Sequence, residues 1–211
     1  MKEYKLPIGC DVPETIILAD GDFPSHPLAL EWLRQCPYVV CCDGAANTYI
    51  RSGRMPEAIV GDGDSLLPDI KERYASLIHS EAEQETNDLS KAFRFCLSQE
   101  RKRITIMGAT GKREDHTIGN VSLLADYMEQ AEVSMMTDYG IFVPIREDSM
   151  FESYIGQQIS VFNMNSTALS AEGLAYPLSV FTNWWQGTLN EALARHFIIR
   201  TDGKVLVFRV F

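Results

Sequence analysis

The chain has 211 residues, of which 45% are hydrophobic and 23% charged, and its formal net charge is −10. This composition argues against a disordered chain, no apolar run approaches the roughly 20 residues of a membrane span, and the excess of acids argues against non-specific nucleic-acid binding. Five cysteines without a CxxC pair argue against a disulfide framework or a zinc site. The apolar run at residues 15–19 is too short for a signal peptide, so we expect a cytoplasmic protein.

Up to about residue 140, short β-branched runs alternate with helical patterns. The runs that predict strands are residues 15–19, 38–42, 58–60, 76–80 and 103–108, and those that predict helices are residues 26–36, 45–53, 68–75, 87–100 and 115–131. Thr86 or Asn87 can cap the fourth of these helices. The alternation predicts a parallel sheet with helices on both faces, and such sheets bind ligands at the carboxyl ends of their strands.

After residue 140 the pattern changes to strand-like segments and turns, at residues 149–156, 157–164, 168–179, 197–203 and 204–211. Asp202 and Gly203 lie between two apolar runs, which predicts a hairpin because Asp-Gly favours a tight turn. A unit of about 70 residues is marginal alone, so we expect it to pack on the first region or on a partner. The expected fold class is α/β, with a parallel-sheet, three-layer N-terminal domain at residues 1–140 followed by a small antiparallel β-sandwich at residues 141–211.

Three of the predicted strands end in aspartates: Asp20 and Asp22, Asp43, and Asp62 and Asp64. Residues two apart in an extended segment point the same way, so Asp62 and Asp64 would project together above the sheet. Crowded carboxylates repel one another unless a cation lies among them, and magnesium binds through one or two carboxylates plus substrate phosphates. The acids therefore suggest a metal that holds a polyphosphate, and the alternative is that each Asp-Gly pair only forms a turn or a cap.

The segment GATGKREDHTIGN, at residues 108–120, opens another predicted helix. Gly108 and Gly111 allow a close turn, and backbone amides at a helix start with nearby cations such as Lys112 and Arg113 form an anion site. The segment is not a P-loop, because Arg113 stands where that motif has Ser or Thr. The alternative is a capped turn with a solvated basic pair, and His116 is more typical of a structural hydrogen bonder than of a base.

Asp88 and Lys91 are three positions apart at the start of a predicted helix and therefore share a face. They could form a surface ion pair of little energetic value. They could also supply a carboxylate for the metal and a cation for phosphate. We favour the second reading, because this helix start faces the same edge of the sheet.

Together these segments resemble the thiamin pyrophosphokinase family. The family pattern has an ANGD turn, then DGAAN, GDFDS, a helix with Q…TD…KA, then G..GGRxDH…N, GLxYPL and SNE. The corresponding segments here are ADGDFP at 19–24, CDGAAN at 42–47, GDGDS at 61–65, QETNDLSKA at 84–92, GATGKREDHTIGN at 108–120, GLAYPL at 173–178 and TLNE at 188–191. Seven segments in the right order cover most of the chain and are more specific than any one of them.

The resemblance implies a magnesium-dependent homodimer that transfers pyrophosphate from ATP to the hydroxyl of thiamin. From the charge and the lack of a long apolar run, we expect no nucleic-acid or membrane partner. The implied metal ligands are Asp43, Asp62, Asp64 and Asp88. The implied catalytic residues are Asp62, Asp64, Asp88, Lys91, Arg113 and Asp115, and the implied nucleotide-binding residues are Asp20, Gly21, Asp43, Gln84, Gly108, Gly111, Arg113 and Asn120. The implied thiamin-binding residues are Trp184, Trp185, Thr188 and Asn190.

Several departures from the family pattern matter. Asp20 stands where Asn is expected, Gly63 where an aromatic residue is usual, Asn87 where Thr is usual and Leu189 where Ser is usual. The loss of a hydroxyl at Leu189 affects the thiamin end, whereas the nucleotide end is barely touched. The alternatives are a non-catalytic sensor of thiamin or a nucleotide, a nucleotidyl- or glycosyltransferase that uses the DxD pattern, and a related pyrimidine alcohol as acceptor.

The adjacent tryptophans Trp184 and Trp185 are candidates for contact with thiamin. Thiamin carries a permanent cation on an aromatic ring, which suits the face of a tryptophan. We expect these residues on a strand, where neighbours face opposite sides, so that at most one would contact the ligand. The alternative is that both pack in the sandwich core or at an interface.

Overall fold

The computed structural model describes residues 1–7, 11–81, 83 and 85–211. Six strands pair in parallel in the order β7-β6-β2-β3-β4-β5. They are β2 (Thr15–Leu18), β3 (Val39–Cys42), β4 (Ala58–Gly61), β5 (Ile78–Ser80), β6 (Arg103–Met107) and β7 (Glu132–Met136). The expected parallel sheet is therefore confirmed.

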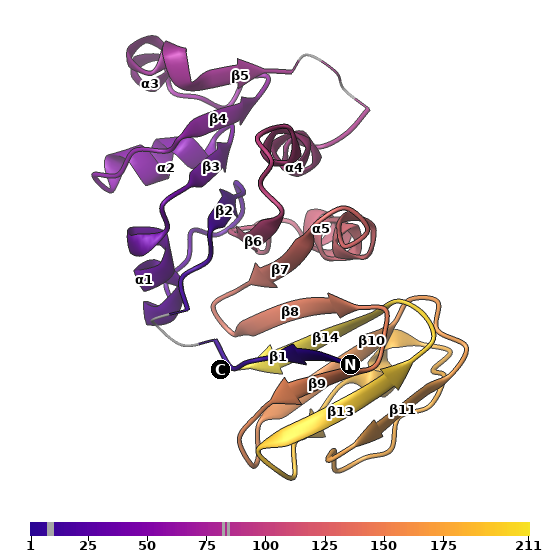
Figure 1. The fold of residues 1–211 in the computed structure, drawn as a ribbon. Helices are drawn as coiled ribbons and strands as arrows, with labels where there is room; N and C mark the ends of the chain where they lie inside the picture. Colours follow the sequence, from indigo (N-terminus) through magenta and orange to yellow (C-terminus); the bar gives the residue numbers. More distant parts are fainter. Residues whose placement is uncertain (8–10, 82, 84) are drawn as a thin grey trace.

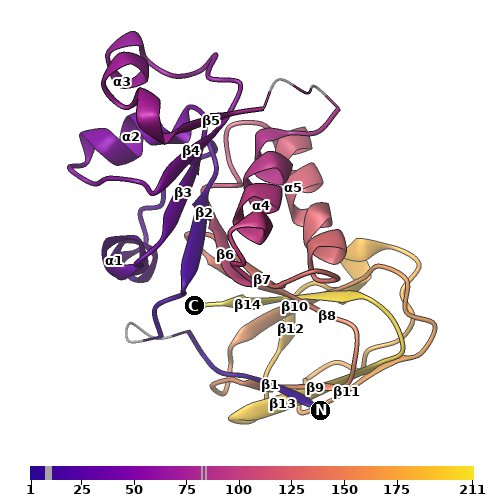
Figure 2. The same ribbon diagram turned by 45° about the horizontal axis from the view of Figure 1, so that its top comes forward.

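Helices cover both faces of this sheet, as the alternation predicts (Figure 2). They are α1 (Pro27–Gln35), α2 (Ala45–Arg51), α3 (Pro68–Arg73), α4 (Asp88–Ser98) and α5 (Glu114–Tyr127), with a short 3₁₀ turn η1 (Ala75–Leu77) before β5. Trp32 of α1 and Tyr49 of α2 belong to the core on one face, while Phe93 of α4 stacks on Tyr127 of α5 in the core on the other, with ring centroids 3.9 Å apart. The central strands are buried on both faces, which explains their unbroken apolar sequences.

The sandwich continues the parallel sheet. β8 (Gly140–Ile145) pairs antiparallel with β7, and β14 (Val205–Val210), β10 (Gln158–Asn163) and β12 (Asn190–Glu191) follow it, so that one sheet of ten strands runs through both regions (Figure 1). A second sheet of four strands, in the order β1-β9-β13-β11, packs on this extension. Its strands are β1 (Lys2–Tyr4), β9 (Ser149–Glu152), β13 (His196–Thr201) and β11 (Leu169–Glu172).

Two features of the sandwich differ from expectation. The hairpin predicted at Asp202-Gly203 is wrong, because β13 and β14 lie in different sheets and the turn between them crosses from one sheet to the other. Neither turn residue has the positive φ angle of a tight hairpin turn, and the Asp202 carboxylate instead accepts hydrogen bonds from Ser166, Thr167 and Ala168. The N-terminal strand β1 pairs with β9, so residues 2–4 lie in the second sheet of the sandwich although they fall within the expected first domain.

Of the helices in the described residues, none is long and apolar enough to cross a membrane.

Candidate active site

The carboxyl ends of β2 and β6 carry two loops that are joined by backbone hydrogen bonds. The Gly21 amide donates to the Gly108 carbonyl at 2.6 Å, and the Asp22 amide donates to the Thr110 carbonyl at 2.8 Å. A Cβ on Gly21 would collide with the carbonyl oxygens of Gly108 and Thr110, so only glycine fits this approach. The two loops therefore form one continuous rim at this edge of the sheet.

Asp43 and Asp88 both lie against Gly61 at the end of β4, on the side to which a side chain at this position would point. A Cβ on Gly61 would lie 2.8 Å from the Asp43 Cβ and 3.4 Å from the Asp88 Cγ. The Asp43 side chain is buried, with the residue 3% exposed, and its Oδ2 accepts a hydrogen bond from the Ser65 amide at 2.9 Å. Its other oxygen, Oδ1, is buried without a hydrogen-bond partner in the described structure. A buried carboxylate oxygen without a donor is costly, which marks this position as one that a ligand would complete.

The electrostatics of Asp43 show how closely the acids gather. Burial raises the pKa of Asp43, and the charges of Asp88 and Asp62 raise it further, although the hydrogen bond from Ser65 acts in the opposite direction. Asp88 and Asp62 therefore lie close enough to Asp43 to disfavour its ionised form, which a bound cation would relieve.

Lys91 is buried beside these carboxylates, and its Nζ donates to the Asp88 Oδ1 at 3.1 Å. Burial lowers the pKa of Lys91, but the hydrogen bond to Asp88 and the charges of Asp88 and Asp62 offset this, and its net pKa is raised. The lysine therefore stays charged. An exposed surface pair does not describe this contact, because the lysine side chain is only 3% exposed.

A second lysine reaches the same edge from the loop after β6. The Lys112 Nζ donates to the backbone carbonyl of Asp20 at 2.8 Å and to its Oδ1 at 3.1 Å. The other carboxylate oxygen of Asp20 lies next to Gly44, where a Cβ would be only 2.7 Å from it. We call the group formed by Asp20, Asp43, Asp62, Asp88, Lys91 and Lys112 the carboxyl-end cluster.

The expected alignment of Asp62 with Asp64 is wrong. β4 ends at Gly61, and Gly63 has a φ of +79°, so the segment turns instead of continuing as a strand. The Asp64 amide donates to the Asp62 Oδ1 at 3.1 Å, which is a local turn, and the Asp64 side chain is exposed. The alternation rule fails because it applies only to extended backbone.

No three His, Cys, Asp or Glu side chains within the described residues form a group that could by itself hold a metal ion. The pair of Asp43 and Asp88 nevertheless fits magnesium, which takes one or two carboxylates and completes its shell with water and phosphate oxygens. The unpartnered Oδ1 of Asp43 is a suitable ligand atom.

Three other residues expected at the nucleotide end have different surroundings. Arg113 and Asp115 form an ion pair of 2.6 Å with each other on the exposed first turn of α5, and the hydrogen bond from Arg113 lowers the pKa of Asp115. Asn120 donates to the Ala109 carbonyl at 2.9 Å and accepts from Asn87, which also caps α4, so it ties the rim to that helix. Gln84 lies outside the described residues.

The tryptophans of the sandwich lie in a 3₁₀ turn, η2 (Trp184–Gly187), and the expectation of a strand there is wrong. Consecutive residues of such a turn are about 120° apart, so both side chains can face outward. Trp184 makes a T-shaped contact with Phe162, with ring centroids 6.1 Å apart, and Trp184 is 44% exposed, whereas Trp185 is 73% exposed. Trp185 is thus the more available aromatic face.

Asn190 and Thr188, both expected to contact thiamin, make internal hydrogen bonds. Asn190 is buried; its amide donates to the Tyr176 carbonyl at 2.8 Å and its oxygen accepts from the Tyr176 and Glu191 amides. The Thr188 hydroxyl donates to the Trp185 carbonyl at 2.7 Å. These bonds fix the backbone at Tyr176 and the η2 turn.

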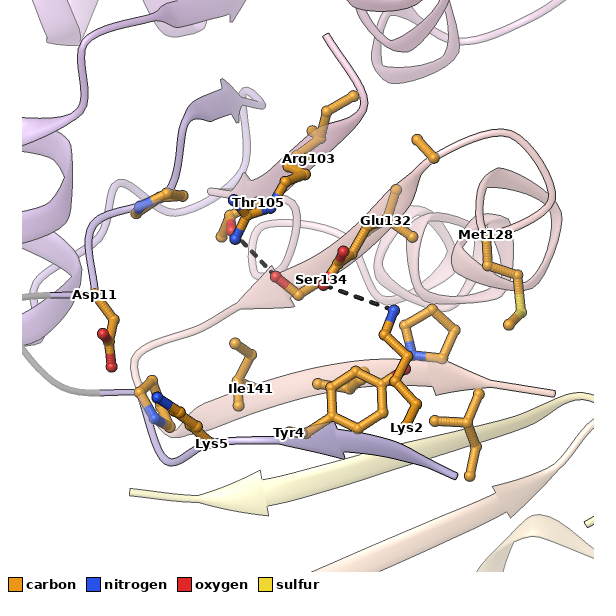
Figure 3. A pocket seen from close by; sticks show the side chains of 18 of the residues that line it. Lys2, Tyr4, Lys5, Asp11, Arg103, Thr105, Met128, Glu132, Ser134 and Ile141 are labelled. Atoms are coloured by element: carbon orange, nitrogen blue, oxygen red, sulfur yellow. Dashed lines mark hydrogen bonds and ion pairs between the residues drawn. The ribbon is translucent and has the colours of Figure 1, made fainter. Parts of the chain in front are cut away.

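A groove of about 920 Å³ opens at the amino ends of β6 and β7, at the opposite end of these strands from the carboxyl-end cluster (Figure 3). Lys2 and Glu132 form an ion pair of 3.6 Å in its wall, and the hydroxyls of Thr105 and Ser134 lie 3.1 Å apart. The groove is therefore not part of the carboxyl-end cluster.

Models of known families match both the parallel-sheet region and the sandwich. The family model described as thiamin pyrophosphokinase, catalytic domain, matches residues 29–136, and the one described as thiamin pyrophosphokinase, substrate-binding domain, matches residues 140–208. The chain belongs to the thiamin pyrophosphokinase family. The boundary between the two matches falls between β7 and β8, where the sheet changes from parallel to antiparallel.

Curated relatives are similar over part of the chain. Thiamine pyrophosphokinase 1 of Oryza sativa subsp. japonica is 30% identical over 129 residues, which cover 49% of this chain and 49% of the relative. Thiamine pyrophosphokinase of Bacillus subtilis (strain 168) is 34% identical over 86 residues, which cover 39% of this chain and 40% of the relative. The chain therefore aligns with about half the length of the rice relative and less of the bacterial one.

Solved structures of the family share the fold. A thiamin pyrophosphokinase from Candida albicans superposes with a TM-score of 0.80 at 18% identity, covering 100% of this chain and 93% of that chain. One from Bacillus subtilis gives a TM-score of 0.77 at 20% identity, covering 93% of this chain and 98% of that chain.

The departures from the family pattern have structural explanations in part. Asn87 caps α4 by accepting from the Ser90 amide at 2.9 Å, as Thr can, and Gly63 has a φ of +79°, which residues with a side chain rarely adopt. Leu189 is 76% exposed with a φ of +61°. The sequence identifies Lys112 as a possible cation but does not predict its contact with Asp20. A signal for this pair was present, because the family pattern has the neutral residues Gly at position 112 and Asn at position 20.

Proposed function

We propose that this chain transfers pyrophosphate from ATP to the hydroxyl of thiamin, giving thiamin diphosphate and AMP. The observation that carries the proposal is the pair of carboxylates, Asp43 and Asp88, that meet beside Gly61, with one buried oxygen of Asp43 unpartnered among the described residues. Membership of the thiamin pyrophosphokinase family supports it.

Asp43 and Asp88 would hold Mg²⁺, with Asp62 beside them as a further or water-bridged ligand, and a metal bound there would neutralise charge on the phosphates. Lys91 holds the Asp88 carboxylate in place through its 3.1 Å contact. The chain's part in the reaction is then to position the reactants and to stabilise charge, which is most of what phosphoryl-type transfer requires of a protein.

In the proposed step, the thiamin oxygen bonds to the β-phosphorus of ATP, and the bond from that phosphorus to the oxygen shared with the α-phosphate breaks. AMP leaves with that oxygen. The proton of the thiamin hydroxyl passes to a carboxylate oxygen of Asp62, Asp64 or Asp88. Asp62 and Asp88 are the better placed of the three, because Asp64 is exposed and makes only the local turn with Asp62.

The proposed thiamin site includes residues of the sandwich. Trp185 offers an exposed aromatic face, and a cation over such a face contributes about 0.5–2 kcal/mol. Tyr176 and Leu189 are also exposed, at 64% and 76%. Exposed apolar side chains of this size favour coverage by another surface, which supports a homodimer in which a second copy completes the thiamin site.

The test is an assay of the purified chain with ATP, Mg²⁺ and thiamin, in which thiamin diphosphate and AMP are separated by chromatography. We expect both products in equal amounts, and neither when thiamin is omitted or the metal is chelated. Release of inorganic pyrophosphate or of a nucleoside diphosphate would indicate a nucleotidyl- or glycosyltransferase instead. Binding of both ligands without AMP would indicate a sensor.

A further inference from the structure

Lys112 joins the two loops at the rim of the carboxyl-end cluster. Its Nζ contacts both the backbone carbonyl and the carboxylate of Asp20, which lies 92 positions away in the chain. Lys112 has a φ of +57°, a left-handed backbone conformation that lysine rarely adopts. A residue held in an unfavourable conformation so that its side chain reaches one particular carboxylate points to a role at that carboxylate.

Asp20 would add a further negative charge to an acidic site. One of its oxygens lies against Gly44, the neighbour of Asp43, and Asp43 is already affected by the charges of Asp88 and Asp62. A nucleotide polyphosphate is itself strongly anionic. Without compensation, the charge of Asp20 would oppose its binding.

We propose that Lys112 is a nucleotide-positioning residue that cancels the charge of Asp20 and holds the Asp20 loop against the loop after β6, so that the anionic polyphosphate is accepted. This inference rests on the proposed function, since it concerns the same nucleotide. It also accounts for two departures from the family pattern together, because the pattern has neutral Asn at position 20 and Gly at position 112, and each charge here is balanced by the other.

A role in stability alone does not explain the pair. The two side chains are 54% and 47% exposed, and ion pairs that face water contribute little to stability. The pair instead changes the electrostatic energy of any charged ligand that approaches the cluster. This effect extends over about one Debye length, or about 8 Å at physiological salt.

The test is equilibrium binding of MgATP to four variants and the wild type. The variants are K112M, D20N, the double variant D20N/K112M, and the control K102M. Met keeps a Cβ at position 112, so the backbone strain is retained while the charge is lost. Lys102 is also exposed and precedes β6 at its other end, so K102M changes the net charge equally but away from the cluster.

We expect K112M to weaken MgATP binding about tenfold at low salt and less at high salt, because one compensating charge near a polyphosphate is lost and salt screens the effect. D20N should bind MgATP at least as tightly as the wild type. The double variant should return to within about threefold of the wild type, because it has neither charge. K102M should match the wild type.

The inference is overturned if K112M binds like K102M, or if the double variant remains as weak as K112M, which would mean that Lys112 does not act through Asp20. In the conversion assay, K112M should raise the KM for ATP with little change in kcat and in the melting temperature, whereas a purely structural role would lower the melting temperature. If the wild type binds MgATP but releases no AMP with thiamin, the proposed function fails while the binding comparison still decides the role of Lys112. If the wild type does not bind MgATP, both fail.

Discussion

Asp43, at the carboxyl end of the parallel sheet, and Asp202, in the sandwich, have opposite electrostatic surroundings. Burial and the charges of Asp88 and Asp62 raise the pKa of Asp43, and one of its oxygens has no partner in the part of the chain that the structure describes. Hydrogen bonds from Thr167, Ala168 and Ser166 lower the pKa of Asp202 well below its usual value, and both of its oxygens are occupied.

The difference separates a carboxylate that serves the fold from one that we propose to bind a ligand. Asp202 stabilises the turn between the two sheets because the chain itself supplies its donors. Asp43 destabilises the isolated fold when it is ionised, because the chain supplies too few donors and brings other acids close. A feature that costs stability and is still present is better explained by function than by folding.

The largest expected effect that tests this comparison is in the variant D43N. We expect it to lower the rate of AMP formation about 100-fold or more, because an electrostatic group at the reacting phosphates is lost. Its melting temperature at neutral pH should be equal to or higher than that of the wild type. The sign follows from the pKa, since a carboxyl whose pKa is raised in the folded state favours folding at low pH and loses that contribution as the pH rises. Activity would be measured by chromatography and stability by thermal unfolding.

The matched control for D43N is D69N, on the exposed first turn of α3, which removes an aspartate charge outside the carboxyl-end cluster. In the wild type, affinity for MgATP should fall as the pH drops towards the raised pKa of Asp43, and D43N should lose that dependence. Retained activity in D43N together with a lower melting temperature would show that Asp43 is structural, and the comparison would then fail.

An intermediate effect is expected in D202N. Removing the charge weakens the hydrogen bonds from Ser166 and Thr167, so the melting temperature should fall by a few degrees at neutral pH, with no change in MgATP binding. The pKa of Asp202 lies below the unfolded value of about 3.9, so its stabilisation is present above that pH and is lost as the pH falls. The difference in melting temperature between D202N and the wild type should therefore shrink in acid. A difference that stays constant from neutral pH to pH 3 would contradict this assignment.

The smallest expected effects are in W184A and W185A. W185A should raise the KM for thiamin about threefold to tenfold through loss of a cation–π contact, and W184A should raise it less, because that ring packs on Phe162. Neither should change the KM for ATP. If the KM for thiamin were equal in both variants and the wild type, the tryptophans would not belong to the proposed thiamin site.

The sequence by itself determined the order and type of most elements. Strands buried on both faces need unbroken apolar runs, and helices need a period of about 3.6 residues, so local pattern alone predicts β2 to β6 and α1 to α5. It also identified the acids at the strand ends, because in a parallel sheet these positions meet at one edge.

Only the tertiary structure decided which of those residues meet. The approach of Asp43 to Asp88 beside Gly61, and of Lys112 to Asp20 over 92 positions, depends on strand order and on loop angles that no local pattern encodes. For the same reason the turn at Asp202 joins two sheets instead of forming a hairpin, and Trp184 and Trp185 lie in a 3₁₀ turn. Local periodicity reports how a segment is buried, whereas a site is built from contacts between segments.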